Sequence, residues 1–163
     1  MKSILLKALL FINLFFIYNC KAQTTSDYIT FYNDVVPKLN SIVPNKTQFY
    51  GHNFSNFNTK LKNKNVEIVR WFQDTKISPS TKYYVLKLFF FDRSLLSVAS
   101  DNDFNFPRVI ITFENEIPSQ VQNLMVESRG DWTYNVQQFF ANLKIEKIEF
   151  TGVKGYDSHD YSE

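Results

Sequence analysis

Hydrophobic residues recur at helical spacing in the first part of the chain after residue 26. Apolar side chains three or four positions apart predict a helix over residues 27–42, with one face formed by Tyr28, Phe31, Tyr32, Val35, Leu39 and Ile42. Pro37 falls inside this pattern, so we expect a kink or a break there. A weaker pattern of the same period predicts a second helix over residues 54–63.

The period then changes to one typical of β-strands. Residues 66–72 and 83–91 are rich in β-branched and aromatic side chains and are bounded by polar or proline-containing stretches. The second run is almost continuously apolar, which predicts a central strand covered on both faces. Residues 108–114 and 145–153 predict two further strands. Residues 94–100 fit either a short helix or a strand, and the pattern does not choose between them.

Between the third and fourth strands, the pattern predicts a pair of helices. Pro118 opens the first and Gly130 ends it, and Asp131 caps the second. This order of elements favours an α+β fold with a single domain at residues 27–153, built on a mainly antiparallel sheet of about four strands with helices packed on one side. Residues 154–163 carry no apolar pattern, so we expect a mobile C-terminal tail.

The N-terminal residues have the layout of a secretory signal peptide, which we assign to residues 1–19. They contain Lys2 and Lys7, no acidic residue, and an apolar run from Ala8 to Tyr18 that only Asn13 interrupts. This run is shorter than the roughly 20 apolar residues that a membrane-spanning helix needs. The sequence therefore predicts that the protein is exported.

The single cysteine, Cys20, directly follows this segment. The preceding Ile17, Tyr18 and Asn19 place an aliphatic residue three positions before it, and in this the chain resembles bacterial lipoproteins at their lipobox. The resemblance implies a lipid anchor at Cys20, a location in the bacterial cell envelope, and a tether over residues 20–26. The alternative is ordinary cleavage after Ala22, which would give a periplasmic or secreted protein.

Composition narrows the possible partners of the mature chain. Two of the 18 Lys and Arg residues belong to the predicted signal, so 16 basic residues remain against 16 acidic ones. A chain without excess positive charge has no overall electrostatic attraction for phosphates, so we expect no nucleic-acid partner. With no second cysteine, the mature domain forms no internal disulfide.

The sequence contains no catalytic motif that we recognise, and we predict no catalytic residue, metal site or cofactor. The two histidines, His52 and His159, lie in a predicted turn and in the predicted tail. Glu114 and Glu116 alternate at the end of a predicted strand, where solvent-facing carboxylates are common. Whether the protein is an enzyme stays open, although a non-enzymatic role is favoured.

Aromatic residues make up 17% of the chain and offer the remaining functional signal. Three of them lie in predicted turns and not on periodic core faces, so we predict that Tyr50, Phe104 and Phe106 contribute to an exposed binding surface. The leading interpretation is a binding or assembly module of the envelope with an unidentified protein or ligand partner. The alternatives are a hydrolase that acts through carboxylates, and a periplasmic immunity or inhibitor protein.

Overall fold

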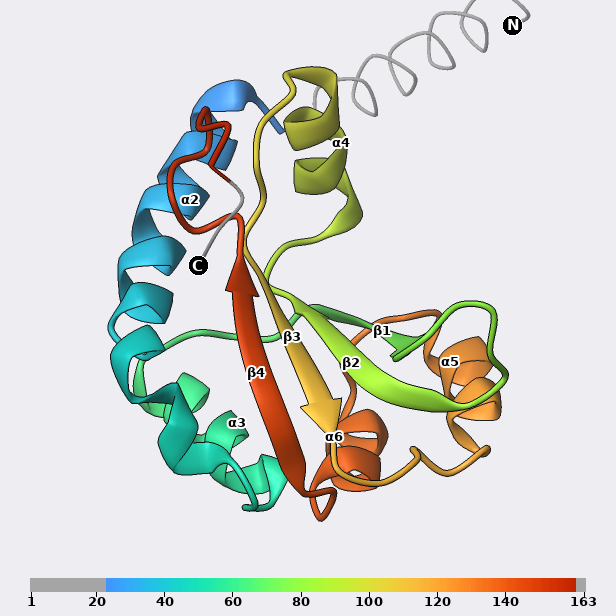
Figure 1. Cartoon of the computed structure of the whole chain (residues 1–163). Helices are drawn as coiled ribbons and strands as arrows, with labels where there is room; N and C mark the ends of the chain where they lie inside the picture. The colour runs from blue at the N-terminus through green and yellow to red at the C-terminus, as the bar shows by residue number, and fades with distance from the viewer. Residues whose placement is uncertain (1–22, 161–163) are drawn as a thin grey trace, which may run out of the picture.

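The four strands of the sheet lie side by side in chain order. In the computed structural model, which describes residues 23–160, they are β1 (Arg70–Thr75), β2 (Tyr83–Phe89), β3 (Arg108–Phe113) and β4 (Ile145–Thr151), as Figure 1 shows. Each strand pairs with the next in antiparallel orientation. The predicted α+β class with four antiparallel strands is therefore confirmed.

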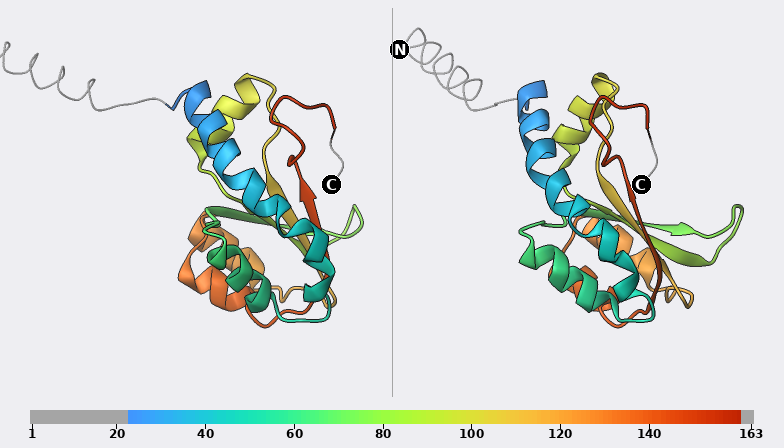
Figure 2. Two further views of the ribbon diagram at one scale, coloured as in Figure 1. Left: turned by 90° about the vertical axis from the view of Figure 1, so that its left-hand side faces the viewer. Right: turned by 60° about the vertical axis from the view of Figure 1, so that its left-hand side comes forward.

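Six helical segments are described, and they leave one face of the sheet uncovered. They are α2 (Thr25–Asn40), the 3-10 helix η1 (Val43–Phe49), α3 (Phe54–Asn63), α4 (Arg93–Asp101), α5 (Val121–Ser128) and α6 (Tyr134–Phe140). No helix crosses in front of β2, β3 and β4 in Figure 1. Figure 2 shows the same layers from the side, with the β1–β2 hairpin projecting away from the helices.

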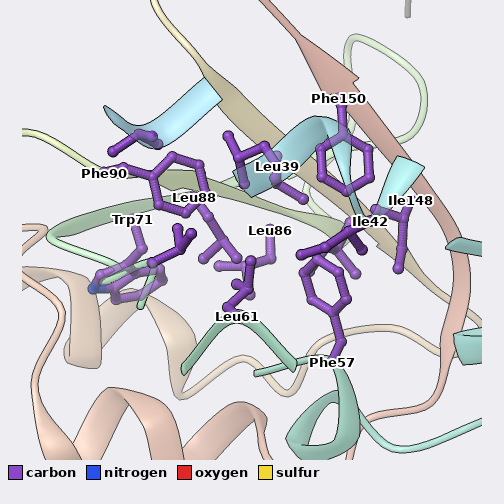
Figure 3. Packing of buried hydrophobic residues seen from close by; sticks show 14 of the residues in the cluster. Leu39, Ile42, Phe57, Leu61, Trp71, Leu86, Leu88, Phe90, Ile148 and Phe150 are labelled. Atoms are coloured by element: carbon purple, nitrogen blue, oxygen red, sulfur yellow. The ribbon is translucent and has the colours of Figure 1, made fainter. Parts of the chain in front are cut away.

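Alternate side chains of the strands build the core on the helical side of the sheet. Trp71, Leu86, Leu88, Ile148 and Phe150 are buried there. Leu39 of α2, Phe57 and Leu61 of α3, and Ile42 between α2 and η1 join the same cluster, which Figure 3 shows. Burial of these large side chains on one face of the sheet is the main stabilising term of the fold.

Helix α2 starts earlier than the sequence predicts and does not break at its proline. Thr24 and Asp27 form a reciprocal capping box, so the helix begins at Thr25 and the predicted tether ends at Thr24. The helix continues through Pro37 to Asn40. Val36 and Leu39, on either side of the proline, are buried in the same core, and this packing holds the two halves in one helix.

The two strands of the hairpin are displaced from their predicted bounds. Residues 66–69 precede β1, while the strand itself continues to Thr75 because β2 supplies pairing partners up to that point. Strand β2 ends at Phe89, and Phe90 and Phe91 are buried beyond its end. Strand β2 is central as predicted, but helices cover only one of its faces.

The undecided segment at residues 94–100 is helix α4. The Asp92 side chain accepts a hydrogen bond from the Leu95 N–H at 3.0 Å and so caps the helix. Helix α6 is capped by Thr133 and not by Asp131, so it is shorter than predicted. Helix α5 ends at Ser128, followed by Arg129 and Gly130 in left-handed backbone conformations.

The first residues of the predicted tail are packed against the domain. The Gly155 N–H donates to the Tyr32 hydroxyl at 2.9 Å, and the Asn105 Nδ2 donates to the Gly155 carbonyl at 3.1 Å. The ring of Tyr156 meets those of Tyr32 and Phe104 edge to face. The packed domain thus extends past residue 153, to at least Tyr156.

The predicted signal peptide and Cys20 lie outside the residues that the structure describes. Within residues 23–160, no helix has both the length and the apolar character needed to cross a membrane.

Candidate functional site

The face of the sheet opposite the helices, which we call the open face, mixes aromatic and charged side chains. The register places Phe72, Lys87, Ile110 and Glu149 in one row across the four strands. The neighbouring row holds Arg70, Phe89, Arg108 and Thr151. All of these side chains are partly accessible to solvent, in contrast to the buried residues that alternate with them.

Aromatic rings form a continuous cluster over one end of the open face. The Phe72 and Phe89 rings meet edge to face with centroids 6.4 Å apart, and Phe89 lies 6.4 Å from Phe106. Phe91 contacts both Phe89 and Phe106 edge to face, with ring centroids 5.9 and 5.6 Å apart. Because Phe91 is buried and anchors the cluster, the exposed ring of Phe72 belongs to a rigid apolar surface.

Arg108 places a positive charge next to these rings. Its Nε donates to the Thr151 Oγ1 at 2.7 Å, and its guanidinium lies 5.6 Å from the centre of the Phe106 ring. No carboxylate lies within ion-pair distance of Arg108 in the part of the chain that the structure describes. Arg108 and Phe106 line two adjoining hollows of about 450 and 660 Å³, so one arginine and one aromatic ring connect them.

An ion pair lies at the centre of the hairpin on the same face. The Lys87 ammonium contacts the Asp74 carboxylate across β1 and β2. The hydrogen bond from Lys87, together with one from the Thr75 N–H, holds the pKa of Asp74 below its usual range. The two charges neutralise each other, so this pair adds no net charge beside Phe72.

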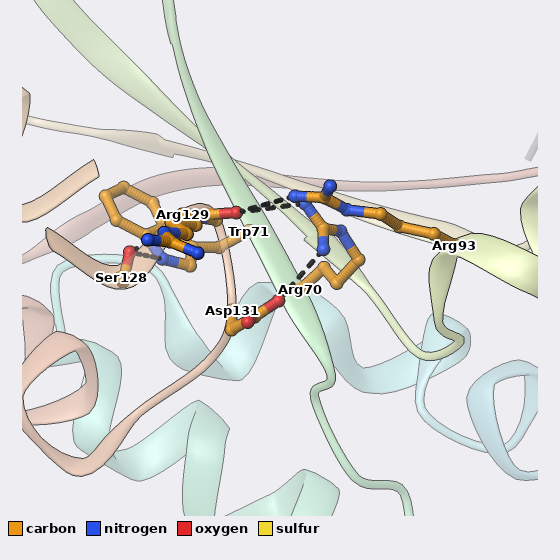
Figure 4. A network of polar contacts seen from close by, with 7 residues as sticks. Arg70, Trp71, Arg93, Ser128, Arg129 and Asp131 are labelled. Atoms are coloured by element: carbon orange, nitrogen blue, oxygen red, sulfur yellow. Dashed lines mark hydrogen bonds and ion pairs between the residues drawn. The ribbon is translucent and has the colours of Figure 1, made fainter. Parts of the chain in front are cut away.

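Two further arginines converge at the edge of β1, as Figure 4 shows. Arg70 and Arg93 both donate to the Arg129 carbonyl oxygen, each at 3.2 Å, and Arg70 also pairs with Asp131 at 2.9 Å. The acceptor lies at the C-terminal end of α5, where cations are stabilised by the helix dipole. Gly130 follows with a φ of 78°, a left-handed conformation that glycine adopts without strain.

The structure brings two of the three predicted aromatic residues together. Phe106 lies within the cluster on the open face, and Phe104 lines the neighbouring hollow while stacking on Tyr28 at 5.6 Å. Tyr50 lies apart from them, where its hydroxyl is 3.4 Å from the Ile148 nitrogen at the free edge of β4. Tyr50 therefore covers a strand edge and does not extend the cluster.

Sequence reasoning missed Phe72 and Phe89, the two rings that connect the surface to β1 and β2. A signal was present in the alternation of Trp71 and Phe72, since one of two adjacent strand residues must face away from the core. Within the apolar run at residues 83–91, no such alternation marks Phe89 as a surface residue.

The polar residues considered for chemistry are dispersed. Glu116 pairs with Lys82 at 3.5 Å, and the Glu114 carboxylate lies near Gly51. His52 borders a separate hollow beside α3, whereas His159 lines the 660 Å³ hollow that Phe106 and Arg108 also line. Across residues 23–160, no three His, Cys, Asp or Glu side chains are placed to hold a metal ion.

Comparison with known proteins adds no relative. No protein-family model, no curated protein and no solved structure matches the chain. The geometry of the open face is therefore the main evidence about what the protein does.

Proposed function

We propose that the protein is an exported binding module of the bacterial envelope, anchored by a lipid on Cys20, which engages a protein partner through the open face of its sheet. The observation that carries the proposal is Phe72. This ring is 48% exposed in the middle of β1 and continues into the cluster with Phe89 and Phe106. Aromatic and arginine side chains are enriched at the centres of protein interfaces.

Phe72 lies at a position where an exposed aromatic side chain is unusual. Strands at the edge of a sheet usually carry charged or polar residues on their exposed face, because these prevent unwanted association. Phe72 lies on such a strand, and its exposed ring stabilises the fold less than a fully buried ring would. A partner that covered Phe72 would bury its ring against other rings that are already fixed, with little loss of side-chain entropy.

The charges around the cluster favour a partner segment that carries Asp or Glu. The guanidinium groups of Arg93, Arg108 and Arg129 have no carboxylate within ion-pair distance among the described residues. All three border hollows next to β1 or β3. A carboxylate of the partner near Arg108 would gain a charge-assisted hydrogen bond at the margin of the apolar contact.

Cys20 supports the proposed envelope location, and the start of α2 limits how far the domain can lie from the anchor. Only residues 21–24 separate Cys20 from the first residue of α2. The five backbone steps from Cys20 to Thr25 span at most about 18 Å when fully extended. If Cys20 carries the lipid, the domain is held close to the membrane surface, and the partner is a membrane or periplasmic protein within that reach.

Co-purification from cells tests this proposal. Full-length tagged protein and its Phe72→Ser and Arg108→Gln variants would be isolated in detergent after mild cross-linking, and bound proteins quantified by mass spectrometry. We expect one or a few partners with wild type, and at least about a tenfold loss with Phe72→Ser, since removing a central aromatic anchor costs about 2 kcal/mol or more.

Tyr134→Ser provides the matched control. Tyr134 is 73% exposed on α6, on the other side of the sheet, so its replacement removes an exposed aromatic residue without touching the open face. Equal recovery of the partners with wild type and Phe72→Ser, when both proteins have the same melting temperature, would contradict the proposal.

A further inference from the structure

A second cavity lies on the helical side of the sheet, away from the open face. It has a volume of about 400 Å³ and is bounded by α3, by the segment at residues 65–68 and by α6. Its size is within the range of small-molecule sites. The polar and aromatic side chains that matter for binding are Asn58, Lys62, Asn65, Glu67, Trp132 and Gln137.

Asn58 is the unusual residue of this cavity. It lies inside α3 and is only 5% exposed, which makes it the one polar side chain among the buried residues that the structure describes. Between residues 23 and 160, no group is hydrogen-bonded to its side-chain amide. The fully buried side-chain atoms without a hydrogen-bond partner among the described residues are Gln23 Oε1 and Gln73 Oε1, so the Asn58 amide keeps contact with solvent through the cavity. The Asn58 amide borders the cavity, so a ligand there could supply the missing hydrogen bonds.

Trp132 provides a rigid apolar wall of the same cavity. Its ring packs against Phe140, with centroids 6.3 Å apart and planes 13° from parallel, and against Phe54 at 5.9 Å. The backbone N–H of Trp132 donates to the Val69 carbonyl oxygen at 2.9 Å, which fixes the backbone just before α6. The indole is thus held in place before any ligand arrives.

The charged side chains that line the cavity are one cation and one anion, so the lining carries no net charge. Lys62 donates to the Gln137 Oε1 at 2.9 Å and links α3 to α6, and Glu67 supplies one opposite charge. Asn58, Lys62 and Asn65 are spaced along one face of α3 and its C-terminal end. Each amide both donates and accepts, so the cavity is suited to a neutral ligand whose polar groups do the same.

We infer that this cavity binds a neutral polyhydroxylated ligand, one or two rings of a saccharide. Hydroxyl groups both donate and accept, which matches the amides of Asn58, Asn65 and Gln137. The C–H face of a sugar ring is apolar and can lie against the indole of Trp132. An anion finds only one cation here, already bonded to Gln137, and a fully apolar ligand would leave the Asn58 amide without hydrogen bonds.

Tryptophan fluorescence provides the test, because the chain has only two tryptophans and Trp71 is fully buried in the core. The full-length protein would be titrated with glucose, galactose, mannose, N-acetylglucosamine and their β-linked disaccharides, in a detergent without a sugar headgroup. We expect a saturable change with at least one of these saccharides. Asn58→Leu and Gln137→Ala should each weaken binding about tenfold or more, whereas Gln138→Ala, which alters an exposed neighbour on α6, should leave it unchanged.

The melting temperature of the Asn58→Leu variant provides a second measurement. Without ligand, its melting temperature should stay close to that of wild type, because the Asn58 amide contacts solvent in the cavity and makes no side-chain hydrogen bond with residues 23–160. If this variant does not fold, Gln137→Ala decides the outcome. The inference fails if no saccharide in the panel gives a saturable change, which would mean that the cavity holds water only, or if both cavity variants bind as wild type does.

Discussion

Two glycines with the same left-handed backbone differ in what surrounds them, and the difference bears on the open face. A Cβ added to Gly152, at φ 70°, would lie 2.1 Å from the Phe106 carbonyl oxygen and 2.7 Å from its carbon. A Cβ added to Gly51, at φ 74°, would meet nothing closer than 3.8 Å. Gly152 therefore lets the segment that carries Phe106 lie directly against the end of β4.

We predict that Gly152→Ala destabilises the protein far more than Gly51→Ala. The second change costs only the left-handed conformation, about 1–2 kcal/mol. The first adds a backbone clash, for a total loss in the free energy of unfolding of about 3–5 kcal/mol. Urea unfolding of both variants would measure the difference. Equal losses would show that Phe106 is not seated against Gly152.

The site residues could be predicted only in part, for a reason that lies at the residue scale. Turn position selected Phe106 and Phe104, because residues in loops escape the periodic core pattern, and the structure places both rings, partly buried, beside the open face. It also selected Tyr50, whose side chain covers the edge of β4. Phe72 and Asn58 were missed because their exposure is decided by distant elements: helices cover one face of β1, and α6 and residues 65–68 enclose Asn58.

Helices and strands with a long hydrophobic pattern were predicted correctly, but the residues at which they end were not. The strands at residues 83–91 and 108–114 were found from composition, yet β2 stops at Phe89 because β3 offers no partner beyond it. The segment at residues 94–100 has too few apolar positions to separate helix from strand. Its helical form depends on the Asp92 cap and on burial of Leu95 and Ala99.

The Asp92 cap makes α4 sensitive to acid. The hydrogen bond from the Leu95 N–H, helped by Ser94, holds the pKa of Asp92 below its usual range. A carboxyl with a lowered pKa stabilises the fold above its unfolded-state pKa of about 3.9, and this contribution disappears as the pH falls through the folded-state value. Helix α4 should therefore loosen in acid before the sheet does.

We predict that Asp92→Ala lowers the free energy of unfolding at pH 7 by about 1 kcal/mol, and that its difference from wild type shrinks below pH 4. Asp92→Asn should stay close to wild type at pH 7, because asparagine caps helices about as well, but it should lack the acid-dependent part. Denaturant unfolding between pH 2 and pH 7 measures both effects. A constant difference between Asp92→Ala and wild type across that range would refute the role of the carboxylate.

For the whole molecule, the open face matters only if export and anchoring bring it to its partner. We predict that cells incorporate labelled fatty acid into the full-length protein, and that Cys20→Ser abolishes this labelling and releases the protein from the membrane fraction. Lys21→Ser, a change at the adjacent position, is the control and should keep the label. A mature N-terminus at Gln23 would instead establish ordinary cleavage after Ala22.

Site-specific photocrosslinking tests the central claim most directly. Benzoylphenylalanine would replace Phe72 on the open face or, as controls, Val126 on α5 and Tyr134 on α6, which are 77% and 73% exposed on the helical side. After irradiation of cells that produce the full-length protein, we expect a discrete adduct with one protein at position 72 and none at the two control positions. The linked segment of that protein should contain Asp or Glu. Absence of an adduct at position 72, or adducts of equal yield at all three positions, would contradict the assignment of the open face as the binding surface.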